Sequence, residues 1–221
     1  SALPDYNNKV VRYGSLLSQG SKGGQAMFFN GNLGSYLDIQ DIPNWPLTFC
    51  FWFNNTSTAQ TSPATLCSQD GAGNGSAGWG IQVDIFENGT SLGPHYSTNG
   101  STYTPMTPST VSINTWYHVA FVVTPTTVAY YLNGTLIQSI AAVVYNTNRL
   151  VIGKSGDNYR PLNGYIQDIR VFDYALRADE IGYLSKMTYD YNEERALINY
   201  NTPANYLVNM SNWYNIMNIN I

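Results

Sequence analysis

The sequence predicts an all-β fold, an antiparallel β-sandwich or jelly roll, with a short helical extension at the C-terminal end. Three observations predict it. Short runs rich in β-branched and aromatic residues recur along the chain. Asn-Gly pairs at 30–31, 88–89 and 133–134 follow such runs directly and favour tight hairpin turns. Between residues 25 and 172 no stretch requires a long helix, which is typical of sandwiches and jelly rolls.

The expected strands follow one another with turn residues between them. They are residues 25–29, 36–39, 47–53, 64–68, 78–85, 116–123, 127–132, 135–140, 149–153 and 164–172. A short helix is expected to begin at Ala178, because Asp179 and Glu180 would then lie at the positive end of its dipole.

The two cysteines occur in neighbouring predicted strands, Cys50 in 47–53 and Cys67 in 64–68. The polar run 54–63 between them reads as a hairpin loop, which would bring the two side chains close together. A disulfide and a pair of buried thiols are both compatible with this arrangement, and the redox compartment would decide between them.

Composition narrows the classes of function. Of 221 residues only 11% are charged, against roughly 25% in ordinary soluble domains. The net charge of −4 and the lack of a basic run argue against a nucleic-acid partner. No apolar stretch reaches the roughly 18 residues of a membrane span. An uncharged polar surface rich in Asn, Ser, Thr and Tyr favours an extracellular, cell-surface or virion-surface location.

Several motifs occur in an order that resembles one known family. The runs 26–31, 35–39 and 48–53 resemble the opening strands of laminin-G-like domains, and 115–121 with 130–134 resembles their central hairpin. The run 162–181 is similar to the closing strand and short helix of the three-motif laminin-G branch of the concanavalin A-like lectin/glucanase superfamily. The resemblance implies a sandwich domain over residues 1–186 and a separate extension over 187–221.

The strand around Gln82 decides between an enzyme and a binding module. Gln82, Asp84 and Glu87 lie at the spacing of the E-x-D-x-x-E strand of laminarinase-type glycoside hydrolases, but the first carboxylate is replaced by an amide. A neutral amide cannot serve as the nucleophile of a retaining glycosidase. Strand alternation directs Ile81 toward the core and leaves Gln82 and Asp84 outward, where they could hydrogen-bond sugar hydroxyls. The sequence therefore predicts no enzymatic activity, and a degenerate glycoside hydrolase is the least favoured alternative.

Other catalytic chemistry has no support, and no cofactor is required. No nucleophile elbow, phosphate loop or zinc motif is present. Calcium is the one candidate ion, because the resemblance implies a site at one rim of the sandwich with Asp and Asn oxygens as ligands. Asp157 and Asn158 lie where the pentraxin branch places such ligands, and Asp70 is a second donor in a Gly-rich loop. Turn formation explains the same residues without a metal.

A ligand site on such a sandwich needs exposed aromatic rings beside polar side chains. The loops 70–78, 94–103 and 154–160 combine the two, and the stretch from Asp157 through Asn158 and Tyr159 to Arg160 is the densest mixture. Tyr96 and Tyr103 are further candidates for stacking on sugars, and the Gln82–Asp84 face is the second predicted location. Trp79 fits a core role better.

The C-terminal extension carries its own pattern. Thr202 and Pro203 are typical of a helix start, and Tyr206, Met210, Trp213 and Met217 then recur at helical spacing. This stripe predicts packing on the sandwich, or else a partner or oligomer contact.

Together these observations predict a non-catalytic, lectin-like module whose partner is a glycan or glycoprotein surface. The alternative is a structural adhesion module, or a virion or cell-surface coat component, that binds protein. A fold of this kind serves both purposes.

Overall fold

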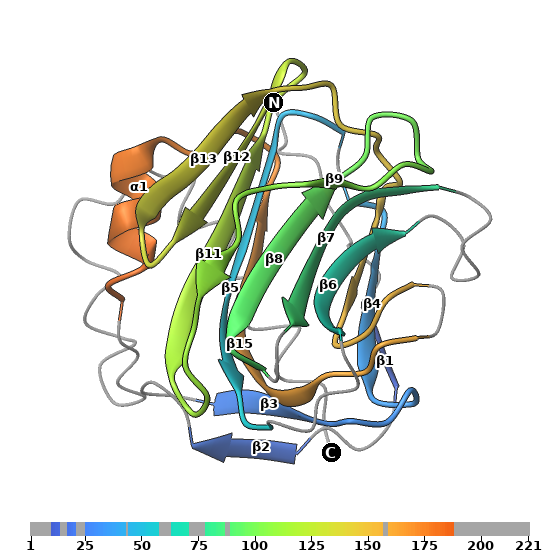
Figure 1. Cartoon of the computed structure of the whole chain (residues 1–221), viewed down its shortest axis with the longest axis vertical. Coiled ribbons are helices and arrows are strands. Elements are labelled where there is room, and N and C mark those ends of the chain that lie inside the picture. The colour runs from blue at the N-terminus through green and yellow to red at the C-terminus, as the bar shows by residue number, and fades with distance from the viewer. Residues whose placement is uncertain are drawn as a thin grey trace, which may run out of the picture.

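The computed structural model describes residues 10–13, 17–20, 25–42, 44–57, 63–70, 78–86, 89–156 and 159–187. It shows two antiparallel sheets stacked face to face (Figure 1). The first sheet, called sheet 1, runs in the order β1 (Val10–Tyr13), β4 (Tyr36–Gln40), β14 (Arg149–Ile152), β6 (Ala64–Asp70), β7 (Trp79–Phe86), β8 (Ser91–Tyr96) and β10 (Ser109–Thr110), with β9 (Thr104–Pro105) also paired to β8.

The second sheet, called sheet 2, contains the long central strands of the sequence. Its order is β13 (Thr135–Ala141), β12 (Thr127–Leu132), β11 (Trp116–Val123), β5 (Leu47–Asn55), β15 (Asn163–Phe172), β3 (Gln25–Asn30) and β2 (Leu17–Gly20). The predicted all-β antiparallel sandwich is thus confirmed. The Asn-Gly turn between β12 and β13 has φ angles of 50° at Asn133 and 79° at Gly134, the left-handed conformation that a tight hairpin needs.

The core between the sheets follows from strand alternation. On β7, Ile81, Val83 and Ile85 are fully buried and face sheet 2. On β5, Phe49, Phe51 and Phe53 point back toward them, and the ring of Phe49 stacks on Phe121 of β11 with centroids 5.2 Å apart. Buried aromatic and aliphatic side chains of this size supply most of the hydrophobic stabilisation of such a domain.

A second apolar layer lies on the outer face of sheet 2, where α1 (Ala178–Leu184) packs (Figure 1). Ile181 and Leu184 of α1 share this buried cluster with Cys50, Ala120, Val122, Tyr131, Phe172 and Leu176. The helix begins where the sequence predicts. The Glu180 carboxylate accepts a hydrogen bond of 2.8 Å from the backbone N–H of Arg177, which satisfies one donor at the helix start.

The expected hairpin over residues 54–63 is wrong, because the chain crosses from sheet 2 to sheet 1 between β5 and β6. Cys50 consequently faces α1, whereas Cys67 lies in the core between the sheets. Both are free, buried thiols, and burial raises the pKa of Cys50 to about 12. Of the two alternatives for the cysteines, the structure has the buried thiols.

The predicted helix beyond Pro203 lies outside the described residues, which include only Met187 of the predicted extension 187–221, so the division at residue 186 stays a prediction. In the part of the chain that the structure does describe, no helix is long and apolar enough to cross a membrane.

Candidate functional site

The outer face of sheet 1 carries a polar group of side chains centred on β7. As predicted from alternation, Gln82 and Asp84 point away from the core that holds Ile81 and Val83. The prediction that their polar atoms are open to sugar hydroxyls is wrong. Gln82 is only 2% exposed and Asp84 only 1%, because Thr65, Tyr103 and Arg160 contact their polar atoms and cover them.

The Asp84 carboxylate is fully engaged with its neighbours. Thr65 of β6 donates to its Oδ1 at 2.6 Å, and the Nε2 of Gln82 lies 3.0 Å from Oδ1 and 2.8 Å from Oδ2. The guanidinium of Arg160 reaches Oδ2 at 3.2 Å. Burial raises the pKa of Asp84, while the hydrogen bonds of Thr65 and Gln82 and the charge of Arg160 oppose that rise. These contacts hold the carboxylate in one position.

Gln82 has a donor side and an acceptor side, and both are used. Its Nε2 faces Asp84, and its Oε1 accepts from the Tyr103 hydroxyl at 3.2 Å and from Ser68 Oγ at 3.4 Å. A carboxylate at this position would bring two negative groups together and could not donate. The local network therefore requires an amide at position 82.

Tyr103 covers this network from outside. Its ring stacks on the buried ring of Trp79, with centroids 3.7 Å apart and planes inclined by 25°. The side chain remains 46% exposed, so one side of the ring packs on Trp79 while part of its surface is open to solvent. The partly exposed Arg160 lies over the same network through its ion pair with Asp84, which places an aromatic ring and a cation on one face of sheet 1.

His95 of β8 extends this face toward the sheet edge. Its ring meets those of Phe86 and Tyr103 edge-on, with centroids 5.8 Å apart in both cases. Burial lowers the pKa of His95, although the negative charge of Asp84 and the carbonyl of Gly93 act in the opposite direction. Its Nδ1 is buried, and nothing among the described residues forms a hydrogen bond with it.

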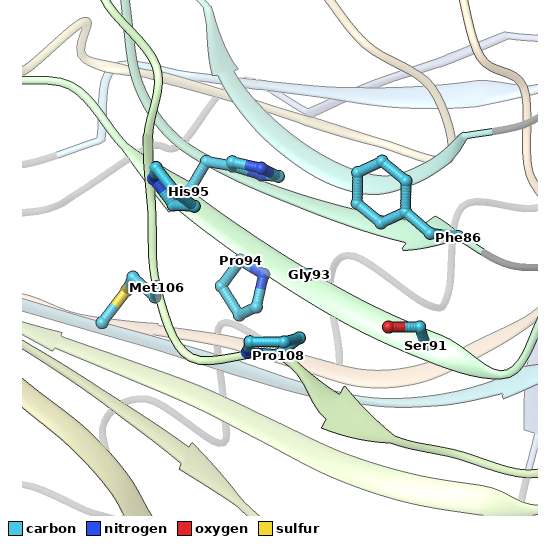
Figure 2. A pocket seen from close by; sticks show the side chains of 8 residues that line it. Phe86, Ser91, Gly93, Pro94, His95, Met106 and Pro108 are labelled. Atoms are coloured by element: carbon cyan, nitrogen blue, oxygen red, sulfur yellow. The ribbon is translucent and has the colours of Figure 1, made fainter.

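A hollow of about 430 Å³ opens beside His95. It lies along β8, between the part of that strand that pairs with β9 and the part that pairs with β10. Figure 2 shows the rings of Phe86 and His95 above the strand, with Pro94, Met106 and Pro108 below. The lining is mostly carbon, and comprises Phe86, Ser91, Gly93, Pro94, His95, Pro105, Met106 and Pro108.

The structure brings together only some of the predicted site residues. Arg160 from the 154–160 loop joins Gln82, Asp84 and Tyr103, so the two locations predicted separately share this face. Tyr159 beside Arg160 is 66% exposed. Tyr96, in contrast, is 9% exposed and packs in the core between the sheets, because alternation on β8 turns it to the same side as Leu92.

The predicted calcium ligands are placed only in part. Asp157 and Asn158 lie outside the described residues. Asp70 is buried at the end of β6, and its side chain lies directly against the α-carbon of Gly156, next to the loop that carries Asp157. Within the described ranges no three His, Cys, Asp or Glu side chains gather in a way that would hold a metal ion.

Sequence reasoning missed Thr65, Phe86 and His95. Residues 94–103 read as a polar loop, although β8 continues to Tyr96 and pairs with β7 along its length. The alternation of Leu92, Pro94 and Tyr96 inward against Gly93 and His95 outward is the signal that could have placed His95 on this face.

Two stacked antiparallel sheets, with a short helix on the outer face of one and a polar, aromatic face on the other, define a concanavalin A-like sandwich. A laminin G family model, described as Concanavalin A-like lectin/glucanases superfamily, matches residues 23–182. The chain belongs to this superfamily.

Similar proteins include the Adhesion G-protein coupled receptor V1 of Danio rerio, which is 27% identical in an alignment of 179 residues that covers 72% of this chain and 3% of the receptor. Among solved structures, the Botulinum Neurotoxin Type G Receptor Binding Domain superposes with a TM-score of 0.62 at 16% identity, covering 82% of this chain and 46% of that one. The binding domain of Paraclostridial Mosquitocidal Protein 1 gives 0.60 at 14% identity, with 82% and 48% covered. The chain thus spans less than half the length of these proteins, and the structural likeness shows the fold.

Proposed function

We propose that this protein is a non-catalytic recognition module that binds glycans through the outer face of sheet 1, at an extracellular, cell or virion surface. The observation that carries the proposal is the double role of Gln82. It stands where the hydrolase strand has its first carboxylate, and the surrounding donors and acceptors fit an amide.

Hydrolysis of a glycosidic bond by the retaining route needs two carboxyl groups about 5–5.5 Å apart, one of them free to attack. On this face Asp84 accepts hydrogen bonds from Thr65, Gln82 and Arg160 and is shielded from solvent. A carboxylate so engaged is a poor nucleophile, because attack would break its hydrogen bonds. These hydrogen bonds therefore fix the side chains of this face in one arrangement and leave no carboxylate free to attack a sugar.

The surface above the network has the features that sugars bind. Tyr103 presents part of its ring to solvent and is stiffened by the stack on Trp79, so stacking a sugar on it costs little side-chain entropy. Arg160 offers donors at the same place, and Tyr159 adds a second exposed ring beside it. Calcium stays a candidate ion, with Asp70 at the end of β6 as one expected ligand; Asp157, the other, lies outside the described residues.

The similar proteins support a binding role without naming a ligand for this chain. One is an adhesion receptor and others are receptor-binding domains. A second candidate function, a structural or adhesive module that binds protein, is favoured by a similar solved structure described as the binding domain of Botulinum neurotoxin DC in complex with rat synaptotagmin II.

A glycan array tests the proposal, run on the purified chain with and without calcium. We expect binding that Tyr103→Ala removes. Tyr183→Ala is the matched control, because Tyr183 is an exposed tyrosine on α1, across the molecule on sheet 2. An array without signal in either condition would contradict glycan recognition and favour the protein-binding alternative. Hydrolysis of laminarin that Glu87→Ala abolishes would contradict the non-catalytic assignment.

A further inference from the structure

The strand β13, with seven residues, is the longest edge strand in the part of the chain that the structure describes (Figure 1). The other edges are formed by β1 and β2, with four residues each, and by β9 and β10, with two each. No described strand pairs with the outer side of β13, and both Ser139 and Ala141 are exposed. A sheet edge of this kind is a template on which a further strand can pair.

The bonds to the neighbouring strand show which backbone groups of β13 point outward. The N–H of Ala142, directly after the strand, donates to the carbonyl of Thr126 at 3.0 Å. Backbone groups alternate in direction along a strand, so the N–H and C=O of Ile140, which lies opposite a β12 residue, also point toward β12. The N–H and C=O groups of Ser139 and Ala141 therefore point away from sheet 2.

This edge lacks the protection that edge strands usually carry. Natural proteins guard such strands with charged side chains or proline, which discourage pairing with another chain. β13 contains neither, and the chain has no Asp, Glu, Lys or Arg between Glu87 and Arg149. Apolar surface is exposed at both ends, because Leu136 is 49% exposed and Val143, just beyond the strand, is 62% exposed. The edge is thus suited to pairing with a strand that is itself uncharged.

We propose that two copies of this chain associate by antiparallel pairing of their β13 strands. Ser139 of each copy lies opposite Ala141 of the other, and the two Ile140 residues face each other at the two-fold axis. In this register each Ser139–Ala141 pair exchanges both of its N–H···O bonds, so all the outward groups of these residues are used. A register that opposes Ser139 to Ser139 leaves the groups of Ala141 opposite Ile137, where the regular pairing with β12 is interrupted.

The occupant that fits this edge is a second copy. A two-fold axis presents the same edge to itself, so the alternation of side chains matches in both copies. Ser139 and Ala141 are small and let the strands approach, while Ile140 packs partly on the core and gains an apolar cross-strand partner. Although each chain has a net charge of −4, the edge itself carries no charge, so the repulsion is not concentrated where the strands meet.

Pairing of this kind turns the outer faces of both sheets 1 the same way. The two-fold axis stands perpendicular to the joined sheet 2, which keeps sheet 1 of both copies on the same side of it. The two surfaces around Tyr103 can then contact one cell or virion surface together, which raises the avidity of binding. This consequence rests on the proposed function, whereas the association through β13 does not.

Sedimentation velocity of the full chain tests the proposal without any glycan. We expect mainly monomer at about 1 μM and mainly dimer at about 300 μM, as for a small reversible interface. Ser139→Lys places like charges of the two copies on one face of the joined sheet and should weaken the dimer at least about tenfold. Asn32→Lys is the control, because it adds the same charge in the exposed turn between β3 and β4, far from β13 in the order of sheet 2, and should leave association unchanged. Thermal melting checks that each variant folds.

Cysteine cross-linking tests the register. Opposed residues of a non-hydrogen-bonded pair have Cα atoms about 4.5 Å apart, which is within the range of disulfide bonds. Oxidation with copper phenanthroline should therefore convert Ile140→Cys to a disulfide-linked dimer. Asn32→Cys, treated in the same way, should stay monomeric on a denaturing gel. The natural thiols of Cys50 and Cys67 are buried and do not compete.

A chain that sediments as a monomer over the whole range overturns the proposal and leaves the edge to a partner of different sequence. A dimer that Ser139→Lys does not weaken, or in which Ile140→Cys cross-links no better than Asn32→Cys, overturns it as well, because another surface then holds the copies together. A silent glycan array together with a dimer that meets both tests refutes the proposed function alone. A glycan-binding chain that stays monomeric refutes the dimer alone.

Discussion

Gln82→Glu places a carboxyl group where the hydrolase strand has one, and the structure sets the energetic consequence. The Nε2 of Gln82 lies 2.8 Å from Oδ2 of Asp84. Two full negative charges at that separation repel by about 6 kcal/mol at an effective dielectric constant of about 20. Keeping the introduced carboxyl group protonated costs less, about 1.4 kcal/mol for each pH unit above a reference pKa of about 4.3. At pH 7 this amounts to about 4 kcal/mol, so the folded variant takes up a proton.

The direction of the pH dependence follows from this uptake. The pKa of the introduced carboxyl group is raised in the folded state and ordinary in the unfolded state, so below about pH 4 both states are protonated and the loss disappears. As pH rises above the unfolded pKa, the free energy of unfolding of the variant falls relative to the wild type. The loss stops growing only when the pH passes the raised folded pKa.

Urea denaturation of the wild type and of Gln82→Glu, at about pH 4 and about pH 7, measures the difference in their free energies of unfolding at each pH. Most of the expected change in this difference lies between these two pH values. Gln138→Glu is the control, because the Oε1 of Gln138 accepts from the backbone N–H of Thr107 and a carboxylate can accept the same bond. The control should change the free energy of unfolding by less than about 1 kcal/mol at either pH. A loss in Gln82→Glu that is equal at the two pH values, or absent at the higher one, would refute the assignment of donor and acceptor sides to Gln82.

Three further outcomes are expected. Ile181→Ala should lower the free energy of unfolding by about 2–5 kcal/mol in the same urea assay, because Ile181 of α1 is fully buried against sheet 2; a loss below about 1 kcal/mol would contradict that packing. A thiol reagent should label Cys50 and Cys67 only after unfolding, and a reductant should leave the melting temperature unchanged, since both are buried free thiols; fast labelling of the native chain counts against this. Asp157→Ala and Tyr159→Ala should abolish glycan or calcium binding in titration calorimetry while leaving the melting temperature intact, and unchanged affinity in both would place the ligand elsewhere.

The fold class was accessible from local sequence patterns. Alternation on β7 and β11, the Asn133-Gly134 turn and the acidic first turn of α1 are all decided within a few residues, so the sequence could predict them. The pairing of the strands was not accessible in this way. Residues 54–63 have the composition of a hairpin loop, yet they connect two different sheets, because β5 pairs with β11 and β15, which lie far away in the chain.

The candidate site shows the same division. The sequence by itself determined that Gln82 and Asp84 lie on the outer face and that the first hydrolase carboxylate is missing. Only the tertiary structure decided that both are buried, since Thr65, Tyr103 and Arg160 come from three separate segments to cover them. Strand alternation is a property of neighbouring residues, whereas burial and hydrogen-bond partners depend on which distant segments the sheet order brings together.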